Sequence, residues 1–282
     1  MIYFNFVSRI ISFIFICICI CICICICICI NNFFSKVLAQ SDASQKFIGE
    51  EIFEASPYKK FTYYQPTYWL VGENDFKLQF SAKYRLAKSY NIYIAYTQTM
   101  FWAIYDHSKP FTDINFNPEV FYRLLERDAT LIKSIDFGYM HSSNGKDGEL
   151  SRSLDRIYLK TNSIFQIRRN SLYSEFRVYH IRQEELQNDD IKDYLGFWDL
   201  QILVTHILVH EKNRLDLEFK IFAGSNVFDF KKGGRTVGLI YRFESEHFSP
   251  AVYLQYYSGY VESLLNYKNN VDVLRLGLSF SI

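Results

Sequence analysis

The chain is organised by an alternation of apolar and polar residues that starts near residue 76 and recurs to the end of the chain. Between Phe76 and Leu86 every even position is apolar, and the odd positions carry lysine, glutamine, serine and arginine. The same period of two returns between Arg214 and Ile221 and between Leu274 and Ile282. Because successive side chains of a β-strand point to opposite faces, the pattern predicts strands with one apolar and one polar face.

Two classes of all-β protein contain such strands. A soluble sandwich buries its apolar faces in a core, whereas a membrane barrel turns them to lipid and keeps a polar lumen. The polar faces here are rich in charge, the last strand is apolar up to Ile282, and no apolar run after residue 40 is long enough for a membrane helix. These features favour an antiparallel transmembrane β-barrel, with a secreted soluble β-sandwich as the alternative.

Strand number and boundaries follow from the same pattern. We count about eleven candidate strands after residue 75 and expect about twelve, because closed bacterial barrels contain an even number. The stretch from Glu50 to Gly72 is aromatic and contains two prolines, so we expect residues 40–75 to form an N-terminal arm and residues 76–282 the barrel. The segment from Val120 to Ile132 stays open, since its apolar spacing also suits a short helix.

The N-terminus has the organisation of an export signal. Arg9 precedes an uncharged apolar run from Ile10 to Ile30, and a short segment ending in Val37-Leu38-Ala39 follows. A basic start, an apolar centre and a small residue before the cut are typical of a secretory signal peptide. We therefore expect residues 1–39 to be removed, leaving Gln40 as the first residue. The alternative is an uncleaved anchor, because the run is long enough to span a bilayer.

Composition adds three points to this picture. All seven cysteines lie between Cys17 and Cys29, inside the predicted signal peptide, so they predict neither a metal site nor a disulfide framework in the exported protein. The formal net charge is +1, which gives no electrostatic reason to expect nucleic acid as a partner. The aromatic content of 18% suits strands and the aromatic girdles of a membrane barrel.

Candidate chemistry lies between Ile135 and Leu159. Every second residue from Ile135 shares an apolar face that ends in His141 and Ser143, and Asp155 shares a face with Ile157 in the next predicted strand. If the apolar faces meet lipid, three polar residues occupy the wall where polar residues are costly. A serine, a base and an acid are what nucleophilic acyl transfer requires. Each residue alone could instead lie near the headgroups, but three aligned residues favour a catalytic site.

At these positions the sequence resembles the outer membrane phospholipase A family, from about Phe76 to the C-terminus. The motifs that carry the resemblance are His141-Ser142-Ser143-Asn144-Gly145, Ser151-Arg152-Ser153 with Asp155-Arg156, Tyr96-Thr97-Gln98, Ser108 before Pro110-Phe111, and Tyr257-Ser258-Gly259-Tyr260 with Glu262-Ser263-Leu264 and Asn266-Tyr267. The family is a twelve-stranded barrel of the bacterial outer membrane. It hydrolyses acyl esters of phospholipids, with phospholipase A1, A2 and lysophospholipase activity, and depends on calcium as a homodimer.

The resemblance implies roles for individual residues. Ser143 would be the nucleophile, His141 the general base, Asp155 the third catalytic residue and the amide of Gly145 part of the oxyanion hole. Calcium would be bound by oxygen atoms, the ligands a hard cation prefers. The implied calcium residues are Ser151, Lys146 and, donated across the dimer, Ser108. Gln98 would pair with its counterpart at the dimer interface.

Two positions depart from the family pattern. The third catalytic residue is asparagine in the best-known members and is Asp155 here. An anion should hold a protonated His141 more strongly, although it places a charge on the lipid wall. Gly148 replaces an aspartate that binds additional calcium in the family, and only Asp147 and Glu149 beside it could substitute.

The remaining candidates are weaker. His206 and His210 are four residues apart, as in a helical metal site, but we expect them at the end of a strand. The alternative function is a pore or structural barrel without chemistry, which a charged lumen would support but which leaves His141, Ser143 and Asp155 unexplained. Together with the resemblance, the sequence thus predicts a phospholipase of the outer membrane. Its dependence on calcium and its dormancy as a monomer are what the resemblance implies.

Overall fold

We analysed a computed structural model of the chain. It describes residues 61–87, 90–127, 131–167, 170–182, 188–210, 213–243 and 249–281. The predicted signal peptide, its cut after Ala39 and residues 40–60 of the expected arm lie outside the described residues.

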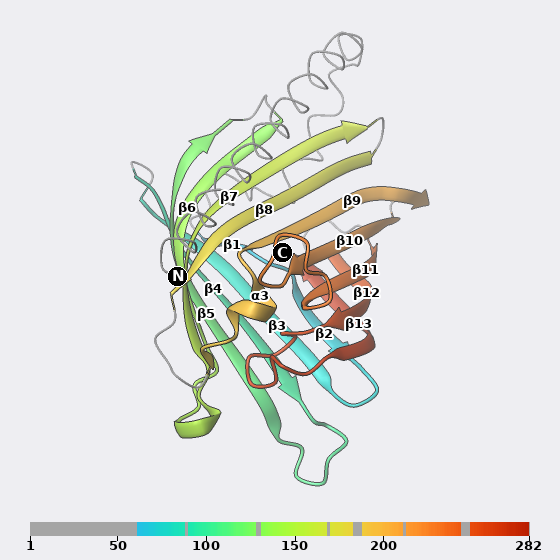
Figure 1. The fold of residues 1–282 in the computed structure, drawn as a ribbon. Helices are drawn as coiled ribbons and strands as arrows, with labels where there is room; N and C mark the ends of the chain where they lie inside the picture. Colours follow the sequence, from blue (N-terminus) through green and yellow to red (C-terminus); the bar gives the residue numbers. More distant parts are fainter. Residues whose placement is uncertain are drawn as a thin grey trace, which may run out of the picture. The chain divides into compact units, whose positions relative to one another are not determined.

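Within these ranges, twelve antiparallel strands close into a barrel (Figure 1), which confirms the predicted all-β architecture. The strands are β2 (Thr67–Val71), β3 (Phe76–Ala87), β4 (Tyr90–Trp102), β5 (Phe111–Glu126), β6 (Ile132–Ser143), β7 (Ser153–Ile167), β8 (Asn170–Arg182), β9 (Trp198–His210), β10 (Asn213–Ala223), β11 (Gly233–Arg242), β12 (Ser249–Gly259) and β13 (Val271–Ser281). A two-residue strand, β1 (Phe61–Thr62), pairs with β3 beyond the end of β2. The connections contain one turn of 3₁₀ helix, η2 (Gly148–Leu150), and the short helix α3 (Lys192–Leu195).

Closure of the barrel depends on β2, which pairs with β13 on one side and with β3 on the other. The strand lies in the stretch expected to be an arm, so the barrel begins earlier than residue 76. Pro66 directly precedes β2, a position where the missing N–H does not interrupt a ladder. With β2, the eleven strands expected after residue 75 become an even number.

The two faces of the wall separate as the alternation predicts. In β5 the residues Val120, Tyr122 and Leu124 are exposed, whereas Phe121 and Arg123 are buried inside the barrel. The segment with ambiguous spacing is therefore a strand as far as Glu126. Exposed apolar side chains cover the outside of the other strands as well, among them Phe80, Ile94, Phe137, Ile157, Leu159, Leu239 and Leu276. In the parts of the chain that are described, no helix is long and apolar enough to cross a membrane.

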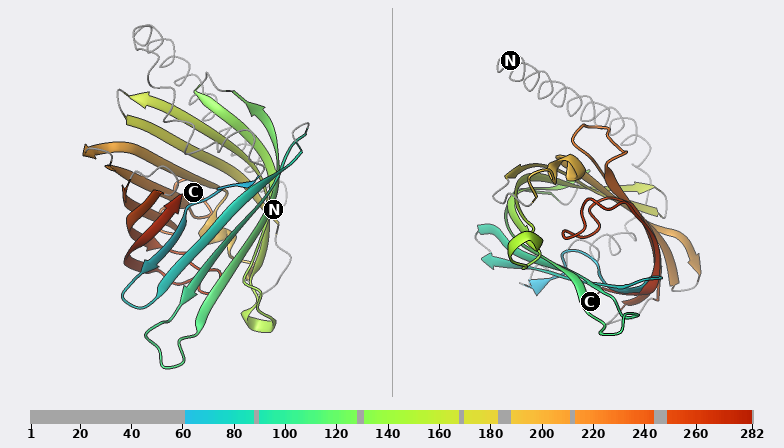
Figure 2. Two further views of the ribbon diagram at one scale, coloured as in Figure 1. Left: turned by 180° about the vertical axis from the view of Figure 1, so that it is seen from behind. Right: turned by 60° about the horizontal axis from the view of Figure 1, so that its bottom comes forward.

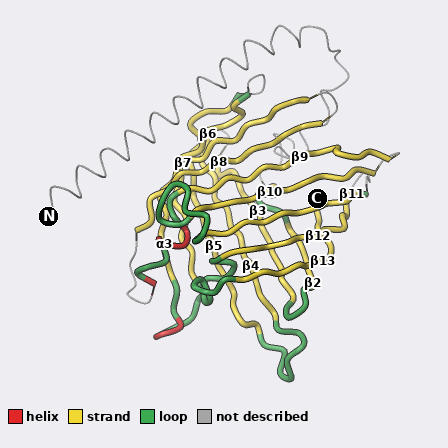
Figure 3. The backbone as a smooth tube through the Cα atoms, turned by 45° about the vertical axis from the view of Figure 1, so that its right-hand side comes forward, coloured by secondary structure: helices red, strands yellow, loops and turns green. Residues whose placement is uncertain are grey.

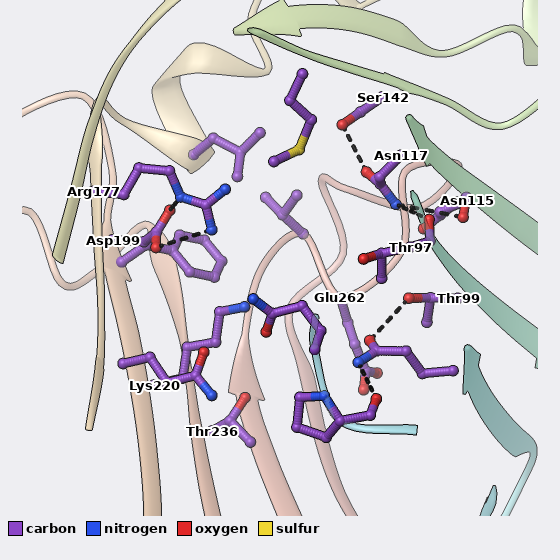
Figure 4. Close-up of a pocket in the computed structure, with 18 of the residues that line it drawn as sticks. Thr97, Thr99, Asn115, Asn117, Ser142, Arg177, Asp199, Lys220, Thr236 and Glu262 are labelled. Atoms are coloured by element: carbon purple, nitrogen blue, oxygen red, sulfur yellow. Dashed lines mark hydrogen bonds and ion pairs between the residues drawn. The ribbon is translucent and has the colours of Figure 1, made fainter. Parts of the chain in front are cut away.

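Charged side chains of opposite sign fill the lumen. Asp136 bonds Arg123 at 2.9 Å and lies 3.8 Å from Lys160, and Lys160 reaches Glu175 on the next strand at 3.6 Å. A charge desolvated in this way is tolerated only when it is paired and hydrogen-bonded. A cavity of about 260 Å³ lies elsewhere in the lumen, and Figure 4 shows polar side chains that line it, among them Asn117, Arg177 and Asp199.

The longer connections gather at one end of the barrel, where β4, β6, β8, β10 and β12 finish (Figure 3). Membrane barrels of bacteria carry long loops on the external side and short turns on the periplasmic side. The end at which β6 finishes and β7 starts is therefore the external end.

The connection after β12 turns into the ring of strands (Figure 2, right). Its Leu264 amide donates to Asn115 Oδ1 at 3.1 Å, and Leu264 packs in a buried cluster with Leu154 and Leu195. At the rim, Tyr267 donates to Asp190, and Lys268 Nζ lies 2.9 Å from the same carboxylate. Burial would raise the pKa of Asp190, but these hydrogen bonds outweigh it and lower the pKa below its usual value. Two external loops are thus tied together over the lumen.

Closure at the β2–β13 seam predicts an effect of one substitution. A Cβ at Gly277 would lie 2.0 Å from the carbonyl oxygen of Trp69, so backbone atoms of the paired strand would have to move. We expect Gly277→Ala to lower the free energy of unfolding by more than about 2 kcal/mol, as overpacking of rigid atoms does. The measurement is urea unfolding in detergent, followed by the gel mobility of unheated samples.

Ser279→Ala is the control on the same strand. It removes only the hydrogen bond from Ser279 Oγ to Thr67 O, 3.2 Å long, and should cost about 1 kcal/mol. Equal effects of the two substitutions would contradict the steric explanation.

Candidate active site

The candidate residues lie on the external ends of two paired strands. In the register of β6 and β7, His141 is opposite Asp155, and Ser143 is opposite Ser153. His141 and Ser143 share the outward parity of Phe137 and Tyr139, and Asp155 shares that of Ile157. The structure thus brings all three predicted residues to one outward patch of the wall.

One contact within the patch has the geometry of a catalytic pair. Nδ1 of His141 lies 2.8 Å from Oδ1 of Asp155. Because a carboxylate can only accept, Nδ1 carries a hydrogen, and Nε2 of the neutral ring is left as an acceptor. The Asp155 side chain is 7% exposed and that of His141 is 37% exposed, so the ring can be reached from outside while the acid is covered.

Ser143 is half-buried and adjoins Phe116 of β5 in the register. It follows His141 by two residues, which places both side chains on the same face of β6. Among the described residues no hydrogen bond joins Ser143 to His141. Such contacts are often long before substrate binds.

Asn144 fixes the loop that follows Ser143. Its side chain is almost fully buried and makes three hydrogen bonds, donating to Leu150 O at 2.9 Å and accepting from the amides of Lys146 at 3.3 Å and Arg152 at 3.0 Å. The backbone N–H of Asn144 also donates to Arg152 O at 3.0 Å. One side chain therefore ties both ends of the loop beside the candidate nucleophile.

Gly145 lies in this loop with φ +65°, a backbone conformation that favours glycine. A Cβ there would also approach Phe116 Cε2 to 2.9 Å. Within the described ranges its amide donates no hydrogen bond, so the donor is available to another molecule.

The residues expected to bind calcium lie in two external loops. Lys146 and Ser151 belong to the loop that Asn144 ties, and Ser108 is exposed in the connection between β4 and β5. The described residues contain no group of three or more histidine, cysteine, aspartate or glutamate side chains that could hold a metal. Beside Gly148, where the family would offer an aspartate, Asp147 accepts from the amide of Gly148 at 2.8 Å.

The catalytic strand is also held from inside the barrel. Ser142 points into the lumen and donates to Asn117 Oδ1 at 2.7 Å (Figure 4). It also accepts from Arg156 at 2.9 Å. Since Ser142 lies between His141 and Ser143, these bonds restrain the backbone that carries both residues.

Gln98 faces outward on β4, as predicted. Within the protomer its side-chain oxygen accepts from Tyr96 OH at 2.8 Å. The register places Gln98 opposite Phe116, and Phe116 opposite Ser143. Gln98 and Ser143 therefore lie at one height, two strands apart, which corresponds to about 10 Å.

Two residues of the site, Tyr139 and Asn144, were given no role from the sequence alone. Tyr139 was assigned only to the apolar face, but its hydroxyl donates to Asp155 Oδ1 at 2.7 Å. Its place two residues before His141 is the signal that could have identified it. Asn144 was part of a motif without a role, and its burial depends on a loop whose shape the sequence does not reveal. His206 and His210, as expected, lie near the end of β9.

Comparison with known proteins identifies relatives of this chain. The sequence profile of a family described as phospholipase A1 matches residues 50–280. A phospholipase A1 of Salmonella typhimurium is 28% identical over 192 residues, which cover 65% of this chain and 60% of that protein. The match thus spans less than two thirds of that relative.

Solved structures share the fold. The outer membrane phospholipase A of Escherichia coli superposes with a TM-score of 0.66 at 21% identity, covering 82% of this chain and 96% of that one. An outer membrane phospholipase of Salmonella typhi, described as a dimer with bound calcium, gives a TM-score of 0.65 at 24% identity over 81% of this chain and 94% of that one. Because the profile matches most of the chain, the protein belongs to the phospholipase A1 family.

Proposed function

We propose that the protein hydrolyses acyl esters of membrane glycerophospholipids, with Ser143, His141 and Asp155 as the catalytic residues. The observation that carries the proposal is the 2.8 Å contact between His141 and Asp155 on a wall that is otherwise apolar. Polar residues facing lipid are costly and are kept where they have a function. Family membership supports the same reaction class.

The reaction proceeds by acyl transfer. Ser143 Oγ attacks the ester carbonyl of a lipid that approaches from the side, and Nε2 of His141 takes the serine proton. The Gly145 amide donates to the oxygen on which negative charge develops. The imidazolium then gives its proton to the leaving alcohol, and water, activated by the same ring, releases the fatty acid and restores the serine.

Asp155 fixes the tautomer and orientation of His141 and stabilises the imidazolium that forms after proton transfer. Relatives with asparagine at this position would rely on a neutral partner. The carboxylate here adds full charge, and its burial beneath His141 and Tyr139 limits its contact with lipid.

Calcium fits the oxygen donors of the two external loops. Lys146 O and Ser151 Oγ would hold the ion from the loop that Asn144 ties, and Ser108 of the partner subunit would complete the site across a dimer. Bound calcium supplies positive charge for the oxyanion. The residues of this chain provide the nucleophile, the base and a loop whose shape is fixed beforehand by Asn144.

We also infer that the enzyme is exported through cleavage after Ala39 into the outer membrane, and that it is active as a homodimer. The height shared by Gln98 and Ser143 supports the dimer, because a second copy seated on β4 would lie beside the nucleophile. A pore is the less favoured function, since paired charges and the loop that carries Leu264 occupy the lumen.

The first prediction concerns the nucleophile. The refolded protein should release fatty acid from phospholipid micelles in calcium and not in chelator, and Ser143→Ala should lower the rate at least about a thousandfold. Ser153→Ala is the matched control, because Ser153 lies opposite Ser143 on the neighbouring strand, and its rate should stay within a few-fold of wild type. If the folded wild-type barrel releases no fatty acid, the proposed hydrolysis is wrong and a pore becomes the favoured function.

The second prediction concerns the cation. Ser151→Ala should weaken calcium binding about tenfold or more, equivalent to about 1.4 kcal/mol, because a hydroxyl ligand is lost. Isothermal titration calorimetry of the detergent-solubilised dimer measures this without relying on activity. Ser263→Ala, in the loop after β12, should leave the affinity unchanged, and equal affinity in both variants would argue against Ser151 as a ligand.

The third prediction concerns assembly. Gln98→Ala should weaken calcium-induced dimerisation, because an amide in an apolar wall gains from a polar partner on the second copy. Analytical ultracentrifugation in density-matched detergent gives the dissociation constant. Gln166→Ala, at the opposite end of the barrel, should not change it. A Gln98→Ala protein that dimerises like wild type would remove Gln98 from the interface.

A further inference from the structure

One oxygen atom of Asp155 has two neighbouring donors. Oδ1 lies 2.8 Å from His141 Nδ1 and 2.7 Å from the hydroxyl oxygen of Tyr139. Tyr139 and His141 both belong to the outward face of β6, so the tyrosine reaches along its own face to a residue of β7. The carboxylate is therefore held by a second side chain in addition to that of His141.

The surroundings of Asp155 explain why a second donor matters. The carboxylate shares the outward parity of Ile157 and Leu159, which are exposed as lipid-facing residues are. A carboxylate in such a place keeps its charge only if hydrogen bonds replace its water. The histidine proton is one donor, and the tyrosine O–H is a second.

The titratable and charged side chains beside this carboxylate include members of two neighbouring strands. On β6 they are His141 and Tyr139. On β8, Arg182 lies directly opposite Asp155, and His180 lies opposite Ile157. Arg182 is exposed at the external end of its strand, whereas the Tyr139 hydroxyl is in direct contact with the acid. The Tyr139 hydroxyl is a neutral donor to Asp155. Removing it therefore changes how the negative charge is distributed on Asp155 but leaves the number of charges in the site unchanged.

We propose that Tyr139 is a positioning residue whose hydroxyl aims Asp155 at His141 Nδ1, shares the negative charge of the carboxylate and so sets the pH at which His141 can act as a base. This inference rests on the proposed function. The hydrogen bond draws part of the negative charge of the carboxylate toward the phenol. Without it, the full charge of Asp155 acts on the imidazolium, which then holds its proton to higher pH.

Tyr139→Phe tests the proposal because it removes one oxygen atom and keeps the ring that covers the acid. We expect kcat to fall about tenfold with little change in KM, because in this proposal the hydroxyl acts on the lipid only through Asp155 and His141. The acidic limb of the pH–rate profile should move to higher pH. Folding of each variant is checked by the mobility of unheated samples.

Two further variants separate positioning from packing. Tyr122→Phe removes a hydroxyl from a similarly exposed tyrosine on β5, opposite Phe137. This variant should change neither kcat nor the pH of the acidic limb of the pH–rate profile. In the Asp155→Asn background, adding Tyr139→Phe should cost less than it does in wild type and should not move the limb, because no carboxylate charge remains to be shared.

The outcomes distinguish this inference from the proposed function. If wild type is active, Ser143→Ala is inactive and Tyr139→Phe leaves the acidic limb in place or moves it to lower pH, the role of Tyr139 is overturned while the function stands. If Tyr139→Phe costs as much in the Asp155→Asn background as in wild type, the tyrosine acts by packing and the inference fails. If wild type is inactive, the proposed function fails first.

Discussion

A backbone surrounded by hydrocarbon has no water to bond with, so a sheet in a membrane must close on itself. In this protein closure depends on β2, a strand of five residues between β13 and β3. On β13, Gly277 has no side chain and so leaves room for the carbonyl group of Trp69 in β2. Pro66 lies directly before β2, where its missing N–H removes no hydrogen bond between strands. The register of every other strand, including that of β6 and β7, is set within this closed ring.

The same ring imposes a rule of alternation, and the candidate site is where the rule is broken. Elsewhere most outward positions are apolar, and many inward positions carry paired charges. At the external end of β6 and β7 a histidine, a serine and an aspartate face outward, and Asp155 is accommodated through contacts with His141 and Tyr139. The inward residue between them, Ser142, is bonded to Asn117 and Arg156, so the exception outside rests on an ordered network inside.

Much of this arrangement could be predicted from the sequence, because alternation alone determines which residues share a face. The outward direction of His141, Ser143 and Asp155 follows from parity, and the structure adds that the two strands pair in the register that joins His141 to Asp155. β2 could not be predicted, since a five-residue strand after a proline shows too little alternation. Sequence periodicity does not reveal strand register or loop shape. It therefore could not predict the contact of Tyr139 with Asp155 or the hydrogen bonds by which Asn144 holds its loop.

The occupied lumen has a consequence for the membrane that would host this protein. Ion pairs between neighbouring strands line the inside of the barrel, and the connection after β12 enters the ring and bonds Asn115. Fixed charges and a covalently attached plug narrow the path that solutes could follow from one side to the other. Many copies would then reside in a bilayer without making it leaky, and any harm to the membrane would be limited to the proposed reaction at the outer wall.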